Sequence, residues 1–321
     1  MKNNYFIYNL KAILRSLYPS LLLPKNREKL LKSLDKRNDL EYIKNRVNYY
    51  CRLNDFKTLG EDSKELSFLR FTIKKTVYFF DTYEYAMYFP KDFKAYFAFG
   101  DINYFLDKPS ITKSRPITNG GGYNKNQNSI LLNLDKIRHF TFINDRFNFD
   151  DKKALLFYRG GIYQSHRIKF FEKYFNNKIC DIGHTGSKSI NKQWLKPKIS
   201  IAKHLPYKFL LSLEGNDVAS NLKWVMSSNS LCIMPKPKFE TWFMEGTLVP
   251  NYHYAEINDD YSNLEEVLCY YRQNPTKAKN IIQNAQEYTK QFFDKQREDI
   301  ISILVLEKYF YYTKQLYKIR I

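Results

Sequence analysis

From about residue 150 onward, short apolar segments alternate with amphipathic segments, and this alternation constrains the fold more than any other feature of the chain. Four segments are typical of buried strands: ALLFYR (154–159), KICDIGHT (178–185), YKFLLSLEG (207–215) and SLCIMPK (230–236). Segments with helical spacing follow or separate them: SHRIKFFEKYF (165–175), VASNLKWVMSS (218–228), NLEEVLCYYRQ (263–273) and TKAKNIIQNAQEYTKQFF (276–293). Strand–helix alternation predicts a parallel sheet covered by helices, as in a Rossmann-like α/β domain. A further strand is expected over TLVPNYHYAEI (247–257).

The first half of the chain has a different pattern. Apolar residues recur at three- and four-residue spacing in FIYNLKAILRSLY (6–18), REKLLKSL (27–34) and DLEYIKNRVNYYCRL (39–53), which predicts helices. Short aromatic and β-branched segments then predict strands over FLRFTIKK (68–75), KTVYFFDTYEY (75–85), KAYFAFGDI (94–102) and SILLNL (129–134). The glycines at 120–122 predict a loop. We therefore place domain limits at 1–149 and 150–300, with a C-terminal helix at 301–321 that packs back on the first domain.

The chain is strongly basic. It contains 52 Lys and Arg against 33 Asp and Glu, a formal net charge of +19. Such a charge favours polyanionic partners, namely nucleic acid, an anionic membrane surface, or phosphorylated sugars and lipids. The apolar and basic segment LKAILRSLYPSLLL (10–23) either packs against the domain or lies on a membrane surface.

The sequence carries no signal for a metal site or a spanning helix. The four cysteines are widely spaced and the five histidines lack HExxH or HxH spacing, so we expect reduced thiols and no protein-built metal site. No apolar run of about 18 residues occurs, and no typical signal peptide begins the sequence. We expect a cytoplasmic protein, with peripheral contact at the inner face of the membrane as an option.

Two loops at the ends of predicted strands are candidates for binding phosphate. In the first, Gly160 and Gly161 allow close approach of a ligand to the backbone, while Arg159 and Arg167 can hold its oxygens. The second follows LLSLEG and contains Asn216, Ser220, Asn221 and Lys223 at a predicted helix start. The alternatives are a plain glycine turn and an ordinary capped helix. Because both loops end strands of one parallel sheet, a shared phosphate site is the better interpretation.

Three further residues are candidates on chemical grounds. Asp101, after a glycine at the end of an apolar strand, is either a general base or an Asx-turn residue. Arg115 either stabilises a phosphate or carboxylate or forms a surface ion pair. Glu240 is a candidate acceptor for ribose hydroxyls, with Glu245 as the alternative. The aromatic rings of Trp242, Phe243 and Tyr252 in the same segment either stack on a ligand or belong to the core.

The order of these motifs resembles glycosyltransferase family 90, which groups lipopolysaccharide sugar transferases, capsule-associated transferases and protein O-glucosyltransferases. The resemblance spans roughly 95–290 and is most specific over 204–254, in the runs HLPYKFLLSLEGNDVASNLKWVMSSNSLCIMP and FETWFMEGTLVPNYHY. It implies a GT-B fold, in which two Rossmann-like domains face each other across a cleft, the first on the acceptor side and the second binding the nucleotide sugar.

The resemblance also implies a chemistry. It indicates inverting, metal-independent transfer from a UDP-sugar, with Asp101 as general base and without any other cofactor. It assigns Arg159, Gly160, Gly161 and Arg167 to the loop that contacts UDP, and it places Ser220 and Lys223 near the diphosphate. Many relatives carry Arg where this chain has Asn221, so the loss of a charged hydrogen bond there must be offset by other cations.

We therefore expect a glycosyltransferase that moves a hexose or pentose to a glycan or glycolipid acceptor, such as the lipopolysaccharide core. Two alternatives remain open at this point. One is a basic nucleic-acid-binding protein, which the absence of an RNP-like run makes the weaker option. The other is a degenerate transferase that acts as a binding protein.

Overall fold

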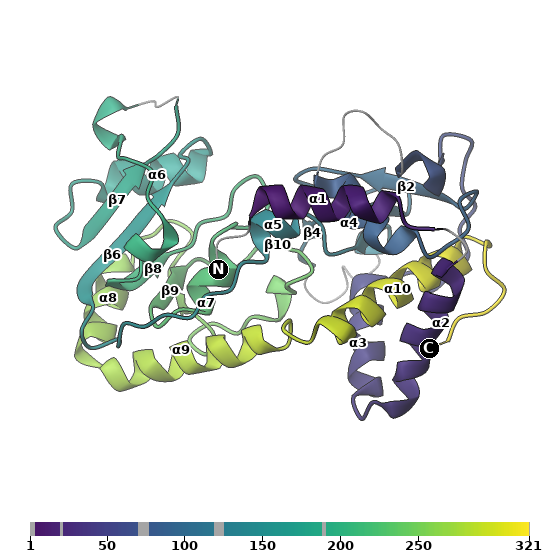
Figure 1. Ribbon diagram of the computed structural model, residues 1–321. Helices are drawn as coiled ribbons and strands as arrows, with labels where there is room; N and C mark the ends of the chain where they lie inside the picture. Colours follow the sequence, from purple (N-terminus) through teal and green to yellow (C-terminus); the bar gives the residue numbers. More distant parts are fainter. Residues whose placement is uncertain (1–3, 20–21, 70–76, 119–124, 188–190, 321) are drawn as a thin grey trace. The chain divides into compact units, whose positions relative to one another are not determined.

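The computed structural model describes residues 4–19, 22–69, 77–118, 125–187 and 191–320. This chain forms two units, each built around a sheet with parallel strands (Figure 1). Unit 1 comprises Thr141–Lys238 and Glu245–Gln291, and unit 2 comprises Lys2–Phe140, Phe239–Met244 and Phe292–Ile321. The domain limits drawn from the sequence stay predictions, because a unit defined by contacts need not coincide with a folding domain.

A five-stranded parallel sheet forms the centre of unit 1, in the order β11-β9-β8-β6-β7. Its strands are β6 (Lys153–Gly160), β7 (Cys180–His184), β8 (Tyr207–Leu211), β9 (Leu231–Met234) and β11 (Ala255–Glu256). The chain passes from β6 to β7 on one side and then continues to β8, β9 and β11 on the other. The direction of travel therefore reverses between β6 and β8. Open parallel sheets bind ligands beside such a switch point, at the carboxyl ends of the strands.

Helices cover this sheet by burying their apolar faces. They are α6 (Ser165–Tyr174), α7 (Leu222–Met226), α8 (Leu264–Gln273) and α9 (Pro275–Lys290), with short 3-10 helices η5 (Lys192–Trp194), η6 (Ile201–Lys203) and η7 (Glu245–Thr247). Phe170 of α6, Leu268 of α8 and Ile281 of α9 share one apolar cluster with the strand residues Leu156 and Phe209. Burial of these side chains is the main driving force for assembling unit 1.

Two sequence predictions in this unit are wrong in extent. The helix expected over 218–228 is confined to Leu222–Met226. The strand expected over 247–257 is reduced to Ala255–Glu256, because Pro250 lacks a backbone donor and Asn251 adopts a left-handed backbone with φ 56°.

Unit 2 contains a four-stranded sheet in the order β1-β2-β3-β5. The strands are β1 (Lys64–Glu65), β2 (Lys94–Ala98), β3 (Ser110–Thr112) and β5 (Ser129–Leu131); β1 is antiparallel to β2, and the other pairs are parallel. A separate antiparallel pair joins β4 (Arg115–Pro116) to β10 (Phe239–Glu240).

The helices of unit 2 come from both ends of the chain. They are α1 (Tyr5–Ser16), α2 (Leu23–Lys32), α3 (Leu40–Tyr50), α4 (Val77–Ala86), α5 (Lys136–His139) and α10 (Lys295–Tyr312), with η2 (Ser33–Lys36) and η3 (Leu66–Leu69). The C-terminal α10 packs on α3, α4 and α2, and its residues 300–306 are all buried (Figure 1). The last helix of the chain thus completes the core begun by the first ones.

One predicted strand of unit 2 is a helix. Residues 77–85 were expected to be extended because they are rich in aromatic side chains, but they form α4. The buried positions Asp81, Thr82, Tyr85 and Ala86 recur at helical spacing, so tertiary packing overrides the β propensity. Part of the strand predicted over 68–75 and the glycines at 120–122 lie outside the described residues.

The prediction of a mixed α/β protein with parallel strands is confirmed. Within the described ranges, every helix is too short or too polar to span a bilayer.

Candidate active-site residues

Arg167 connects the two loops that flank the switch point of unit 1. It lies in the first turn of α6, after the loop that leaves β6. Its guanidinium donates to the carbonyl oxygens of Leu213 and Glu214, at 2.7 Å each, and of Gly161, at 2.8 Å. Since carbonyl groups carry no net charge, these bonds orient the guanidinium without neutralising it.

Side chains from the two loops meet as well. Gln164 donates to the Oδ1 atom of Asn216 at 3.1 Å, and the Nε2 atom of His166 bonds to the carbonyl oxygen of Glu214 at 2.8 Å. Burial lowers the pKa of His166, so this imidazole is neutral at pH 7. The structure therefore brings Gly161, Arg167 and Asn216 together at the edge of the sheet.

Arg159 has a different environment from Arg167. Its guanidinium lies 2.6 Å from the Oδ1 atom of Asp181 on β7, and it covers the ring of Phe157 at 4.3 Å. A phosphate at this position would have to compete with the Asp181 carboxylate. Sequence reasoning missed Asp181, although it lies in the KICDIGHT strand that pairs directly with β6.

Aromatic side chains approach Gly160 and Gly161 closely. A Cβ atom at Gly160 would lie 2.4 Å from the Tyr158 hydroxyl, and one at Gly161 would lie 2.7 Å from the ring of Tyr163. The glycines therefore allow tyrosine side chains to lie against the loop, at the position where the sequence predicts a ligand.

The loop after β7 adds residues that the sequence did not single out. The Nδ1 atom of the buried His184 accepts a hydrogen bond from the backbone N–H of Ile162 at 2.9 Å. The Tyr163 ring meets the His184 imidazole edge-on, and a Cβ atom at Gly186 would lie 1.8 Å from the Tyr163 hydroxyl. The loops after β6, β7 and β8 are thus fastened to one another.

Asn221 precedes α7, and its side chain forms hydrogen bonds at the end of β8. Its amide nitrogen donates to the carbonyl of Leu211 at 2.9 Å, and its Oδ1 atom accepts from the Ser212 hydroxyl at 3.2 Å. Ser220, next to it, is exposed. The sequence predicted an anion site at the start of a helix over 218–228. Because α7 has only five residues, its dipole is small, and this helix start differs from the one predicted.

Lys223 lies in the first turn of α7. Its side chain is fully buried, and its ammonium lies 2.5 Å from the Oε1 atom of Glu245. The structure therefore places this lysine in the interior of unit 1, whereas Asn216 and Ser220 are exposed.

Asp101 lies at the carboxyl edge of the unit 2 sheet. It follows β2 through Gly100, which has a left-handed φ of 118°. Lys113, directly after the neighbouring strand β3, donates to the Asp101 Oδ1 atom at 2.6 Å. Lys113 is buried while 33% of the Asp101 side chain is exposed, so the carboxylate is held in place yet accessible to a substrate.

Two charged residues follow β5 at the same edge. Asp135, which has a left-handed φ of 57°, pairs with Arg138 at 2.5 Å. Burial raises the pKa of Asp135, while Arg138 and Lys113 act in the opposite direction and Asp101 adds to the rise. Asp101, Lys113 and Asp135 each follow a strand closely, and this pattern is visible in the sequence. The parallel pairing of β2 with β3 and of β3 with β5 brings the ends of these strands together.

Arg115 and Glu240 form the centre of a buried network in unit 2. The Nε atom of Arg115 lies 2.7 Å from Glu240, and its other nitrogens donate to the carbonyls of Tyr49 and Ser129. Arg52 reaches the same carboxylate at 3.2 Å, and both Arg115 and Glu240 are almost completely enclosed. The neighbouring Trp242 is buried and stacks on Tyr50 with ring centroids 3.8 Å apart, as expected of a core residue.

Metal ligands are not grouped in the part of the chain that the structure describes. There, no three His, Cys, Asp or Glu side chains lie close enough to hold a metal ion. The cysteines Cys51, Cys180, Cys232 and Cys269 are free thiols.

Comparison with known proteins gives two concordant results. Residues 134–312, more than half of the chain, match the model of the family described as glycosyl transferase family 90. The chain is also 40% identical over 268 residues to the O-glucosyltransferase LpsA of Dichelobacter nodosus, an alignment that covers 84% of this chain and 82% of that protein.

Proposed function

The chain belongs to glycosyl transferase family 90 and is a glycosyltransferase, and we propose that it transfers a sugar from a UDP-sugar to a hydroxyl group of a bacterial surface glycan, such as the lipopolysaccharide core. The observation that carries this proposal is the switch point of unit 1. The loops that flank it lie at the carboxyl ends of β6 and β8, where nucleotide ligands bind in open parallel sheets.

We propose Arg167 as the main cation for the diphosphate. Of the three predicted cations in unit 1, Arg159 faces the Asp181 carboxylate and Lys223 faces the Glu245 carboxylate, while the bonds described for Arg167 go to neutral carbonyl oxygens. A fixed positive charge stabilises the charge that develops on a leaving diphosphate. This supports a reaction without a metal ion, with the nucleotide held at Gly160, Gly161, Asn216 and Ser220.

We propose Asp101 as the general base. In the reaction, the acceptor hydroxyl gives its proton to the Asp101 carboxylate while its oxygen attacks the anomeric carbon of the donor. The bond from that carbon to the diphosphate oxygen breaks, and UDP leaves with the electron pair. Attack opposite to the leaving group inverts the anomeric configuration. The exposure of Asp101 and its bond to Lys113 support this role.

The donor proposed for the first experiment is UDP-glucose, because the D. nodosus relative is named an O-glucosyltransferase. A pentose donor is the alternative within the same proposal. The presence of parallel strands in the main sheet of each unit supports a GT-B arrangement, in which the acceptor and the donor bind to different domains.

The test is a donor screen. Purified protein is incubated with UDP-glucose, UDP-galactose and UDP-xylose, with and without lipopolysaccharide core from a strain that lacks the gene, in the presence or absence of EDTA. We expect UDP release that requires the acceptor and persists with EDTA, and NMR of the product should show the inverted anomer. Absence of UDP release with every donor, together with no thermal shift by UDP, would contradict the proposal.

A further inference from the structure

Helix α1 is attached to unit 2 through polar contacts. The Tyr8 hydroxyl donates to Asp81 at 2.8 Å, and Arg15 donates to Glu84 at 2.8 Å, both acceptors lying on α4. Between them, Ala12 is the only buried apolar residue of this 12-residue helix. The face of α1 that contacts the protein is therefore the more polar one.

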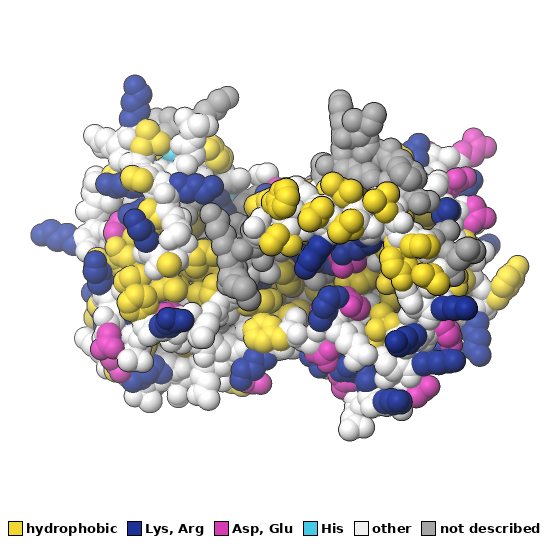
Figure 2. Space-filling model, in the orientation of Figure 1, with side chains coloured by type: hydrophobic (Ala, Val, Ile, Leu, Met, Phe, Trp, Pro, Cys, Tyr) yellow, Lys and Arg dark blue, Asp and Glu magenta, His cyan; other side chains and the backbone are white. Residues whose placement is uncertain are grey.

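The opposite face of α1 is apolar and exposed. Its residues follow the spacing of one helical face and are each between 44% and 74% exposed: Phe6, Leu10, Ile13, Leu14 and Leu17. Figure 2 shows hydrophobic side chains gathered over this helix. A surface helix normally buries its apolar face against the core, so the reversed orientation of α1 indicates an apolar partner.

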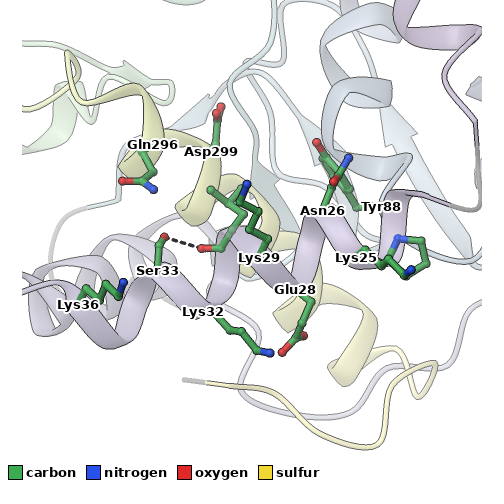
Figure 3. A pocket seen from close by; sticks show the side chains of 12 residues that line it. Lys25, Asn26, Glu28, Lys29, Lys32, Ser33, Lys36, Tyr88, Gln296 and Asp299 are labelled. Atoms are coloured by element: carbon green, nitrogen blue, oxygen red, sulfur yellow. Dashed lines mark hydrogen bonds between the residues drawn. The ribbon is translucent and has the colours of Figure 1, made fainter.

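A row of lysines lies on α2, the next helix of the chain, and on η2. Lys25, Lys29 and Lys32 on α2 and Lys36 on η2 follow helical spacing and line an open hollow, together with the acidic Glu28 and Asp299 (Figure 3). The amide of Asn26 on α2 donates to the hydroxyl of Tyr18, just after α1, at 2.8 Å. Lys and Arg side chains border the hydrophobic patch on the face seen in Figure 2. The two helices thus combine an apolar surface with a basic one.

We propose that α1 and the lysines of α2 bind the surface of an anionic lipid bilayer, with the apolar face of α1 inserted among the lipid headgroups and upper acyl chains. Aromatic residues near both ends of the exposed face, Tyr5, Phe6 and Tyr18, suit the boundary between water and hydrocarbon. Basic amphipathic helices of this kind lie in the plane of the interface.

Charge selects the bilayer over a second copy of the chain. Each copy carries a formal net charge of +19, so two copies that pair through α1 repel each other. An anionic lipid surface is complementary to the same charge. The proposal does not depend on glycosyl transfer, because none of these residues is a candidate for catalysis or donor binding.

The test is cosedimentation of the full-length protein with vesicles of phosphatidylcholine alone or mixed with phosphatidylglycerol. We expect binding to the mixed vesicles that weakens as NaCl is added. The variant L10E/L14E should lose roughly 100-fold or more in partitioning, because two large apolar side chains no longer insert. The matched control L195E/V249E places the same charges on exposed apolar positions of unit 1 and should bind like the wild type.

A second pair of variants tests the lysines. K25Q/K29Q/K32Q should lose roughly 100-fold in partitioning to mixed vesicles, given the usual contribution of each lysine near an anionic surface. The charge-matched control K169Q/K173Q/K178Q, which changes exposed lysines of unit 1, should lose much less. Circular dichroism and size-exclusion chromatography of each variant check folding and oligomeric state.

Three results would overturn the proposal: no binding of the wild type to mixed vesicles, equal losses in variants and controls, or a wild-type dimer that L10E/L14E converts to a monomer without any vesicle binding. The last would identify the apolar face of α1 as an interface between copies.

Discussion

The ammonium of Lys223 lies 2.5 Å from the carboxylate of Glu245, and both side chains are enclosed in the interior of unit 1. This pair decides how Lys223 is to be tested, because a buried ion pair and a phosphate ligand respond differently to substitution. Replacement of one member of a buried pair leaves a charge in a medium that solvates it poorly.

We expect Lys223→Met to lower the free energy of unfolding by about 3–5 kcal/mol, because the Glu245 carboxylate would lose this partner. The double variant K223M/E245M should recover much of the loss, since both charges are then removed. Urea unfolding measures the effect, and Lys198→Met, at an exposed position, is the control. A stable Lys223→Met protein with weakened UDP binding would instead favour a direct role at the diphosphate.

Asp101→Asn should lower kcat by about 10²–10⁴-fold, the usual contribution of a general base, because the amide cannot accept the proton of the acceptor. UDP binding, measured by thermal shift, should be unchanged. Asp107→Asn makes the same chemical change at an exposed position of the same loop and should keep full activity. If both variants turn over at the wild-type rate, Asp101 is not the base.

Arg167→Met should weaken UDP binding. Each hydrogen bond from a charged group contributes roughly 1.5–3 kcal/mol, so we expect a Kd at least about tenfold higher, together with a lower Tm as the loops after β6 and β8 separate. Isothermal titration with UDP measures the first effect. Lys169→Met, an exposed position on the same helix, should change neither quantity. An unchanged Kd in Arg167→Met would shift the diphosphate site away from this loop.

The ion pairs of Glu84 predict a pH dependence of stability. Burial raises the pKa of Glu84, but Lys136 and Arg15 outweigh this effect and hold it at about 2, below the ordinary value of 4.5. The pairing therefore stabilises the folded state above pH 4.5, and its contribution is lost as the pH falls toward 2. At pH 7 the shift corresponds to roughly 3 kcal/mol at most.

We accordingly expect Glu84→Gln to be less stable than the wild type at pH 7, with a difference that shrinks from pH 4.5 to pH 2. Chemical denaturation across this range measures the difference. Glu61→Gln, at an exposed position, should give a curve parallel to the wild type. A constant difference for Glu84→Gln would mean that its effect arises from packing and not from ionisation.

The strands and helices whose apolar residues follow one regular pattern along the chain could be predicted from the sequence. β6, β8 and β9 contain short apolar runs, β7 is a short strand between polar turns, and α6, α8 and α9 have clear helical spacing, so their positions agree with the predictions. The helix α4 could not be identified in this way. Its aromatic residues favour extended structure, and only packing in unit 2 selects the helix.

The candidate site was predictable only in outline. The sequence placed the loops after β6 and β8 at one edge of a sheet, and Arg167 does bridge them. It could not indicate that Lys223 and Arg115 point into the interior, because the partners Glu245 and Glu240 are 22 and 125 residues away. It also missed Lys113, whose contact with Asp101 depends on the parallel pairing of β2 with β3.

The discontinuous composition of unit 2 has a consequence for the synthesis of the protein. Its core includes the buried face of α10, which belongs to the last 30 residues of the sequence. Until that helix is synthesised, the apolar surfaces of α3 and α4 that it covers lack this partner. The last segment of unit 1 ends at Gln291 and precedes the C-terminal segment of unit 2, so unit 1 can complete its core first. The apolar surfaces near the beginning of the nascent chain therefore stay exposed for longer than those of its middle, and exposed surfaces of this kind favour aggregation.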